Sequence, residues 1–174
     1  ELVSDVTTAN NVNGIDMTKI DNVTNTLTGR FKNMDIRGSA VAGSSFDGAI
    51  FTRFDALTIS NSYFKVVAPL TDVACNGLDI VGSATVTCPA IVENIVIDYF
   101  CKGGYGLKLG INNSDANIRD ALVSGVRVNG LYPNIGTPHN VLIGDSSTGT
   151  MRGGYSTYGF VNYILSKSGA FTLD

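Results

Sequence analysis

The chain has 174 residues, a formal net charge of −3 and only 16% charged side chains. Without a basic cluster, a nucleic-acid partner is not expected, and no apolar run approaches the roughly 18 residues of a membrane span. The 20 glycines, the absence of tryptophan and the lack of a helical apolar period indicate one all-β domain. Its weakly charged exterior suits a neutral or mildly charged polymer such as a polysaccharide.

Two families of short apolar segments alternate along the chain. Members of one family have glycine as their second residue, and members of the other carry β-branched or large apolar residues at alternate positions. In chain order the segments are 13–17, 31–39, 47–51, 54–62, 76–80, 92–100, 105–109, 118–126, 129–132 and 138–146. Repeats of roughly 20–50 residues are typical of solenoids. One strand from each family per turn predicts a parallel β-helix of about five coils.

The longer family can be overlaid on a column of β-branched residues: Ile36, Ile59, Ile97, Val123 and Ile143. The overlay also places three asparagines at one position, Asn33, Asn94 and Asn140. Either these asparagines form a hydrogen-bonded ladder between stacked coils, or they mark turns, since Asn tolerates the left-handed region. Both interpretations predict the same fold.

The repeats define three parts of the chain. We expect residues 13–149 to form the β-helix, because the repeats begin at residue 13. Open ends of a β stack need covers. Residues 1–12 are therefore predicted to be an N-terminal cover or a link to a missing domain, and residues 150–174 a C-terminal cap or subunit contact. Since the chain begins at Glu1, we expect it to be processed or part of something longer.

One column of the overlay is charged in every coil: Lys32, Asp55, Glu93, Arg119 and His139. Asp55 and Glu93 would lie in neighbouring coils, with backbones about 4.8 Å apart. Glycoside hydrolysis uses two carboxyl groups across a sugar bond. The catalytic candidates are therefore Asp55 and Glu93, with Asp98 and Asp120 nearby. The alternative is a solvated ladder of surface charges, which contributes little.

Aromatic rings can stack on the face of a sugar, so exposed tyrosines are candidates for substrate binding. Four tyrosines lie at the ends of repeat segments or in expected loops: Tyr63, Tyr99, Tyr105 and Tyr132. Arg119 and His139 of the charged column complete the binding candidates, although His139 has no nucleophile motif beside it.

No metal or cofactor is expected. The cysteines Cys75, Cys88 and Cys101 have no metal-type spacing, so they are either buried thiols or include a Cys75–Cys88 bridge. Aspartates in predicted loops leave calcium as an alternative, namely Asp16, Asp21 and Asp72.

On the repeats from Asn13 to Ile143, the chain resembles the right-handed parallel β-helix, or pectin-lyase-like, superfamily, and within it the β-helix domains of bacteriophage tailspikes and tail fibres. The resemblance implies a homotrimer in the phage virion that acts outside the cell. It also implies binding, and often cleavage, of bacterial capsule or O-antigen by Asp and Glu side chains. The Asn-Thr-Asp, Gly-His-Gly and Arg-Ile-Lys motifs of polygalacturonases are absent. The single histidine, His139, is flanked by Pro138 and Asn140 and not by glycines.

Two other functions remain open from the sequence. One is a structural or adhesive fibre segment without chemistry. The other is a monomeric polysaccharide lyase or hydrolase. Loss of depolymerisation on replacing Asp55 and Glu93 would separate cleavage from the structural role.

Overall fold

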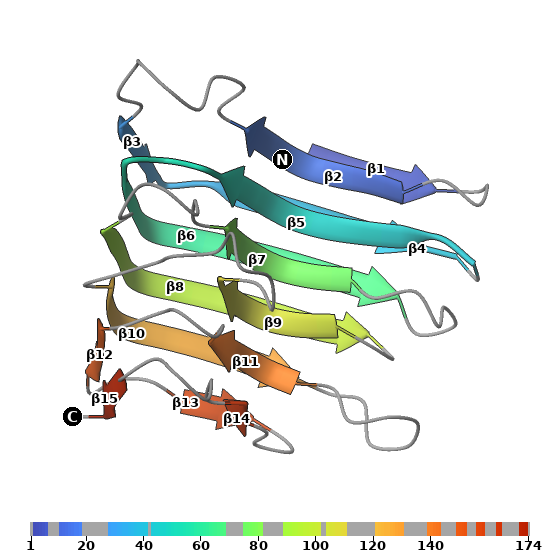
Figure 1. Cartoon of the computed structure of the whole chain (residues 1–174). Helices are drawn as coiled ribbons and strands as arrows, with labels where there is room; N and C mark the ends of the chain where they lie inside the picture. The colour runs from blue at the N-terminus through green and yellow to red at the C-terminus, as the bar shows by residue number, and fades with distance from the viewer. Residues whose placement is uncertain are drawn as a thin grey trace.

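A computed structural model describes residues 2–6, 11–18, 28–41, 43–68, 75–81, 89–101, 104–110, 121–130, 139–143, 149–152, 156–158, 163–164 and 171–173. The described chain is all-β, and its strands form two sheets of parallel strands that are stacked face to face (Figure 1). The predictions of an all-β chain and of parallel strands are therefore confirmed. The arrangement is consistent with a β-helix-like solenoid.

Sheet A has nine strands in the order β1-β4-β6-β8-β10-β12-β15, with β3 beside β6 and β13 beside β10. Their bounds are β1 Leu2–Val6, β3 Thr28–Lys32, β4 Asp35–Ala40, β6 Ala56–Ala68, β8 Ala90–Cys101, β10 Ala121–Gly130, β12 Gly149–Arg152, β13 Ser156–Tyr158 and β15 Phe171–Leu173. Sheet B has six strands in the order β14-β11-β9-β7-β5-β2. These are β2 Asn11–Thr18, β5 Ser45–Thr52, β7 Cys75–Val81, β9 Gly104–Leu109, β11 His139–Ile143 and β14 Tyr163–Ile164.

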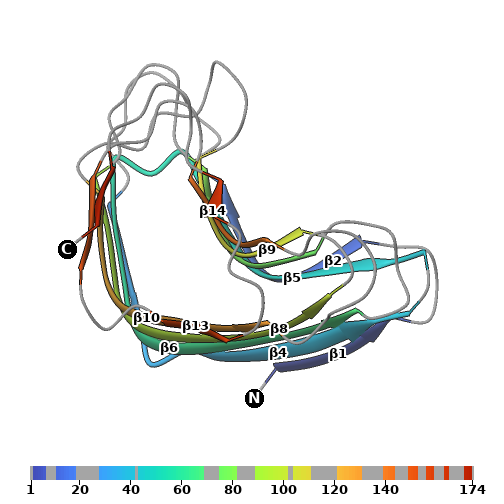
Figure 2. The same ribbon diagram turned by 90° about the horizontal axis from the view of Figure 1, so that it is seen from below.

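From β4 to β11 the chain passes from one sheet to the other at every strand, so each sheet is built from every second strand. Figure 2 shows that both sheets bend in the same sense, with sheet A on the outside of the bend and sheet B on the inside. The alternating apolar residues of both sheets fill the space between them. One column of this core comes from sheet A and consists of Ile36, Phe64, Ile97 and Val128.

Four of the five glycines of the shorter repeat are in register, as the sequence predicts, whereas the fifth, Gly130, lies on β10 of sheet A. Gly14, Gly48, Gly77 and Gly106 lie opposite one another on β2, β5, β7 and β9. Space explains why glycine is needed there. A Cβ on Gly77 would lie 2.5 Å from the backbone oxygen of Gly106 and would also meet the Ile97 side chain. Glycine therefore lets the coils and the two sheets approach closely.

The bend of sheet A also has a sequence cause. Asn33, Asn61, Asn94 and Gly125 lie at equivalent positions and all have positive φ, from 50° to 62°. Asn94 Nδ2 donates a hydrogen bond to Asn61 Oδ1 at 3.2 Å. The turn interpretation is therefore correct for Asn33 and Asn94, and the ladder interpretation is correct for Asn94, whose partner is Asn61. The column continues through Asn61 and Gly125, not through Asn140.

The sequence overlay is wrong in three segments. Ile59 lies opposite Val92 and not Ile97, so residues 54–62 are displaced by five residues. Val123 also lies opposite Val92, which displaces 118–126 by the same amount. The segment 138–146 contributes β11 to sheet B, whereas Asn129 and Gly130 end β10 in sheet A. The cause is that each long strand has apolar residues on both sides of its bend, so a five-residue shift still matches apolar with apolar.

The terminal segments take part in the same sheets. β1 pairs with β4 from Leu2 to Val6, and β12, β13 and β15 extend sheet A. β14 extends sheet B. The boundaries at residues 13 and 149 stay a prediction, because pairing alone does not distinguish a cap from a further coil.

Candidate functional site

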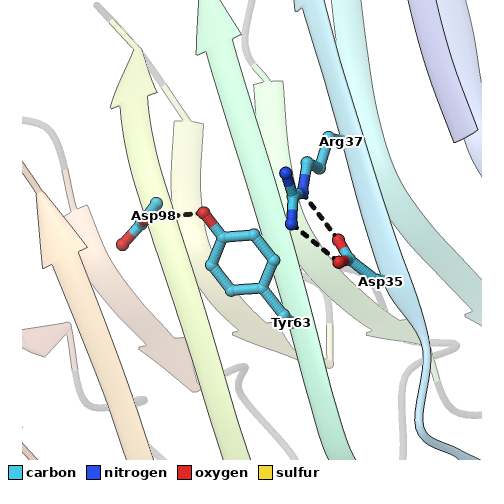
Figure 3. A network of polar contacts seen from close by, with 4 residues as sticks. All are labelled: Asp35, Arg37, Tyr63 and Asp98. Atoms are coloured by element: carbon cyan, nitrogen blue, oxygen red, sulfur yellow. Dashed lines mark hydrogen bonds and ion pairs between the residues drawn. The ribbon is translucent and has the colours of Figure 1, made fainter. Parts of the chain in front are cut away.

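The outer face of sheet A, which is turned away from sheet B, carries a line of polar side chains. Between the inward-pointing core residues, Asp35, Tyr63 and Arg127 belong to one column across the strands. The neighbouring column runs from Arg37 through Lys65 and Asp98 to Asn129. Strand alternation places both columns on the outer face, and Figure 3 shows four of these residues.

Asp98 on β8 is the centre of this group. Tyr63 Oη donates a hydrogen bond to Asp98 Oδ2 at 2.6 Å, and Asn129 Nδ2 donates one to Asp98 Oδ1 at 2.6 Å. Each carboxylate oxygen therefore has a donor from a different neighbouring strand. Burial, followed by the hydrogen bond to Asp98, raises the pKa of Tyr63 to about 12. The phenol consequently stays a donor over the physiological range.

Two arginines extend the group in opposite directions. Arg37 binds Asp35 through two hydrogen bonds, Nε to Oδ1 and Nη2 to Oδ2, both 2.8 Å. Its guanidinium also lies over the Tyr63 ring, 5.1 Å from the ring centre (Figure 3). At the other end, Arg127 Nε donates to Asn129 Oδ1 at 3.0 Å. These six residues, Asp35, Arg37, Tyr63, Asp98, Arg127 and Asn129, are called the Asp98 network below.

A groove lies on the same face, on the other side of the asparagine bend. It has a volume of about 330 Å³ and is lined by Arg30, Phe31, Lys32, Thr58, Ser60, Ile91 and Glu93. A second hollow of about 440 Å³ adjoins it and shares Arg30 and Thr58. The groove offers cations, hydroxyls and one carboxylate. The two regions together give sheet A a polar outer face on both sides of its bend.

The predicted stacking of Asp55 on Glu93 is wrong. Ser60, five residues after Asp55, lies opposite Glu93. Five residues of extended strand span roughly 16 Å, beyond the roughly 5–9.5 Å that separates glycosidase carboxyl groups. Glu93 and Asp98 are also five residues apart, on either side of the Asn94 bend. The structure therefore does not stack Asp55 on Glu93, and it places Glu93 and Asp98 on different sides of the bend in β8.

The binding candidates have different outcomes. Tyr63 lies on the outer face and contacts Asp98, a contact that the sequence did not predict. Tyr99 is 1% exposed and belongs to the core, so its predicted exposure is wrong. Alternation explains this, because Tyr99 falls between the outward Asp98 and Phe100. Tyr105 lies half-buried on β9, opposite the first residue of β11, His139. Arg119, Asp120 and Tyr132 lie outside the described residues.

Sheet B carries a second titratable cluster that the sequence reasoning missed. Lys108 Nζ lies 2.7 Å from Asp79 Oδ2, and both side chains are largely buried. Among the described residues, Asp79 Oδ1 has no hydrogen-bond partner. Nearby, Asp47 Oδ1 accepts a hydrogen bond from the backbone N–H of Asn76 at 2.5 Å. Burial raises the pKa of Asp47 to about 6, and the Asp79 charge adds to the rise. Gly77-Leu-Asp79 and Gly106-Leu-Lys108 occupy the same repeat position, which is the signal that the opposite charges meet.

Within the described residues, no group of three or more His, Cys, Asp or Glu side chains is placed to hold a metal ion. The calcium candidates Asp21 and Asp72 lie outside that part of the chain, and Asp16 accepts a hydrogen bond from Asn13. No helix in the described part of the chain is long and apolar enough to cross a membrane.

Comparison of the chain with protein-family models, with curated proteins and with solved structures finds no match in any of the three. The function is therefore argued from the residues and their geometry.

Proposed function

We propose that the chain is a polysaccharide-binding domain of a bacteriophage tailspike or tail fibre. It is a right-handed parallel β-helix of about five coils that acts as a homotrimer at the surface of the host bacterium. The support for the fibre is the sequence resemblance together with the parallel sheets. The observation that carries the binding role is the Asp98 network on the outer face of sheet A, next to the groove lined by Arg30 and Lys32.

The chemistry of the network suits a saccharide. A sugar hydroxyl both donates and accepts a hydrogen bond. Asp98 and Asp35 supply acceptors, while Arg37, Arg127 and Asn129 supply planar N–H donors. Because the residues come from neighbouring parallel strands, their contacts repeat at about 4.8 Å along the stack. A chain of sugars lying along the stack would meet several such contacts, whereas a single sugar would meet one or two.

We propose binding and not hydrolysis, because Asp55 is displaced by five residues from the position opposite Glu93, and Glu93 and Asp98 lie five residues apart along β8. In the proposed trimer, a carboxylate partner for Asp98 or Glu93 can come from a neighbouring subunit. A search for a cleaving activity should therefore use the trimer.

Binding can be tested with a panel of bacterial capsular and O-antigen polysaccharides, comparing the wild type with Asp98→Asn. The variant keeps the side-chain shape but replaces an anionic acceptor and disturbs the donors Tyr63 and Asn129. We expect affinity to fall at least tenfold, about 1.4 kcal/mol. Asp16→Asn on the exposed part of β2 is the matched control and should bind normally.

Two results would count against the proposal. If the wild type retains no polysaccharide at all, the function is wrong. If Asp98→Asn binds as tightly as Asp16→Asn, the function stands but the outer face of sheet A is the wrong surface. Light scattering coupled to gel filtration tests the trimer separately, since a monomer would contradict it.

A further inference from the structure

Two cysteines meet where the chain crosses from sheet A to sheet B. Cys101 is the last residue of β8 in sheet A, and Cys75 is the first residue of β7 in sheet B. Gly104 begins β9 three residues after Cys101 and lies opposite Cys75. The approach is so close that a Cβ on Gly104, whose φ is 100°, would meet the Cys75 backbone. The crossing therefore brings Cys101 beside Cys75.

The two thiols are buried together. Both residues are 0% exposed and belong to one apolar core cluster. The two thiols influence each other, because Cys101 is the main cause that lowers the pKa of Cys75, and Cys75 adds to the burial that raises the pKa of Cys101. The Phe46 backbone N–H donates to Cys75 Sγ at 3.4 Å, and Cys101 Sγ lies 3.7 Å from the Val66 oxygen that it can donate to. These contacts hold both sulfur atoms in the same small space between the sheets.

We propose that Cys75 and Cys101 form an oxidation site, at which a small-molecule disulfide converts the two thiols into a disulfide bond linking sheet B to sheet A. This pairing differs from the Cys75–Cys88 bridge that the sequence left open. It does not depend on the proposed binding function, because both cysteines lie in the core and away from the outer face of sheet A.

The exchange proceeds in two balanced steps. The Cys75 thiolate attacks one sulfur of the oxidant and expels the other as a thiolate, leaving a mixed disulfide. The Cys101 thiolate then attacks the Cys75 sulfur and expels the second oxidant thiolate. The two cysteines lose two protons and two electrons, and the oxidant disulfide becomes two thiols. In the folded chain the interaction with Cys101 lowers the pKa of Cys75.

The burial of Cys75 and Cys101 determines at which stage the oxidant can reach them. Burial raises the pKa of Cys101 and keeps the oxidant away from both sulfurs in the closed fold. Exchange therefore takes place while the chain folds or when this end of the sheets opens. Once formed, the bond closes a loop of roughly 25 residues and should raise the melting temperature by on the order of 10 °C.

The test refolds the full chain with oxidised glutathione, blocks remaining thiols under denaturing conditions and digests with trypsin and a glutamate-specific protease. No Lys or Arg lies between Lys65 and Lys102, and Glu93 is the one glutamate in that stretch. Digestion thus yields 66–93, with Cys75 and Cys88, and 94–102, with Cys101. The expected product is these two peptides joined by a disulfide.

A Cys88→Ser variant identifies the cysteine, because only Cys75 can then link 66–93 to 94–102. We expect it to form the same linked peptides and to show the same rise in melting temperature, which reduction reverses. Separate peptides in the wild type, with an internal Cys75–Cys88 bond or with all thiols blocked, would overturn the proposal. So would a linked product that disappears in Cys88→Ser while that variant melts as cooperatively as the wild type.

Discussion

Sheet A and sheet B each carry a carboxylate on the face turned away from the other sheet, and the two carboxylates differ in exposure and in hydrogen bonding. Asp98 on sheet A is half-buried, and each of its oxygens accepts a hydrogen bond. Asp79 on sheet B is 4% exposed; one oxygen lies against Lys108, and the other has no partner in the part of the chain that the structure describes. Figure 2 shows why the surroundings differ, because sheet A presents the outside of the bend and sheet B the inside.

On the exposed face of sheet A, a ligand can replace the side-chain contacts, whereas at the buried pair of sheet B it cannot. Ion pairs in water contribute about 0–1 kcal/mol, so a ligand can replace them at little cost. A buried pair has lost its hydration, and removing one partner leaves a charge without compensation. This contrast agrees with the proposed function, which places ligand binding on sheet A, and it gives the Asp79–Lys108 pair of sheet B a mainly structural role.

The largest expected effect is at the buried pair. Replacing Lys108 by Met keeps much of the side-chain volume but removes the cation beside Asp79. We expect the free energy of unfolding at pH 7 to fall by about 3–5 kcal/mol, as for other broken buried pairs. Urea titration followed by circular dichroism measures the change.

The control for this variant is the double change Asp79→Leu with Lys108→Met. Replacing both members of a buried pair by apolar residues is often neutral or stabilising. The double variant should therefore regain most of the lost stability. If Lys108→Met alone costs less than about 1 kcal/mol, the pair behaves like a surface pair and the contrast between the sheets fails.

A smaller effect is expected at Asp47, whose pKa burial raises from 3.8 to about 6. A carboxyl with a higher pKa in the folded chain binds its proton more tightly when folded, so its contribution to stability falls as the pH rises from about 4 to 6. Asp47→Asn removes this charge and should increase the free energy of unfolding at pH 7 by about 2 kcal/mol. At pH 4 the two proteins should differ little. Urea titrations at several pH values measure this difference. If the free energies of unfolding of the wild type and Asp47→Asn change in parallel with pH, the prediction is wrong.

The sequence predicted the fold through its repeats, but it predicted the register only in part. The glycine column from Gly14 to Gly106 was correct, because no other residue fits where neighbouring coils touch. The apolar overlay failed at Ile59 and Val123, because matching on hydrophobicity has two solutions five residues apart. Asn61 would have selected the right solution, since it aligns with Asn33 and Asn94 once the positive-φ position is recognised.

The candidate site was less predictable than the fold, because it depends on that register. Tyr63 and Asp98 were each singled out, yet a displaced overlay could not show that they touch. The predicted exposure of Tyr99 is wrong because a position at the end of a repeat does not decide exposure, and strand parity turns this side chain inward. Nothing in the sequence around Arg37 or Asn129 indicates a site, since their contacts form only when four strands lie side by side.

The asparagine bend provides a prediction of intermediate size that applies to sheet A. Asn61→Ala places an alanine at φ 50° and removes the oxygen that accepts from Asn94. A left-handed conformation costs an ordinary residue roughly 1–2 kcal/mol, so we expect that loss in urea unfolding. Asn61→Gly is the matched control and should lose less, since glycine adopts this conformation freely. Equal losses would mean that the amide ladder, rather than the turn, stabilises the bend.

The smallest effect on stability is expected at Arg37, where the two faces can be compared directly. The side chains of Arg37 and Asp35 are 41% and 44% exposed, against 15% and 6% for Lys108 and Asp79. Arg37→Ala should therefore lower the free energy of unfolding by less than about 1 kcal/mol, even though it removes two hydrogen bonds and the contact with Tyr63. Under the proposed function the same change should weaken polysaccharide binding at least tenfold, because a planar donor is lost from the surface that meets the polymer. If Arg37→Ala loses as much stability as Lys108→Met, the outer face of sheet A is held together in the same way as sheet B. If Arg37→Ala binds polysaccharide normally, that face is not the binding surface.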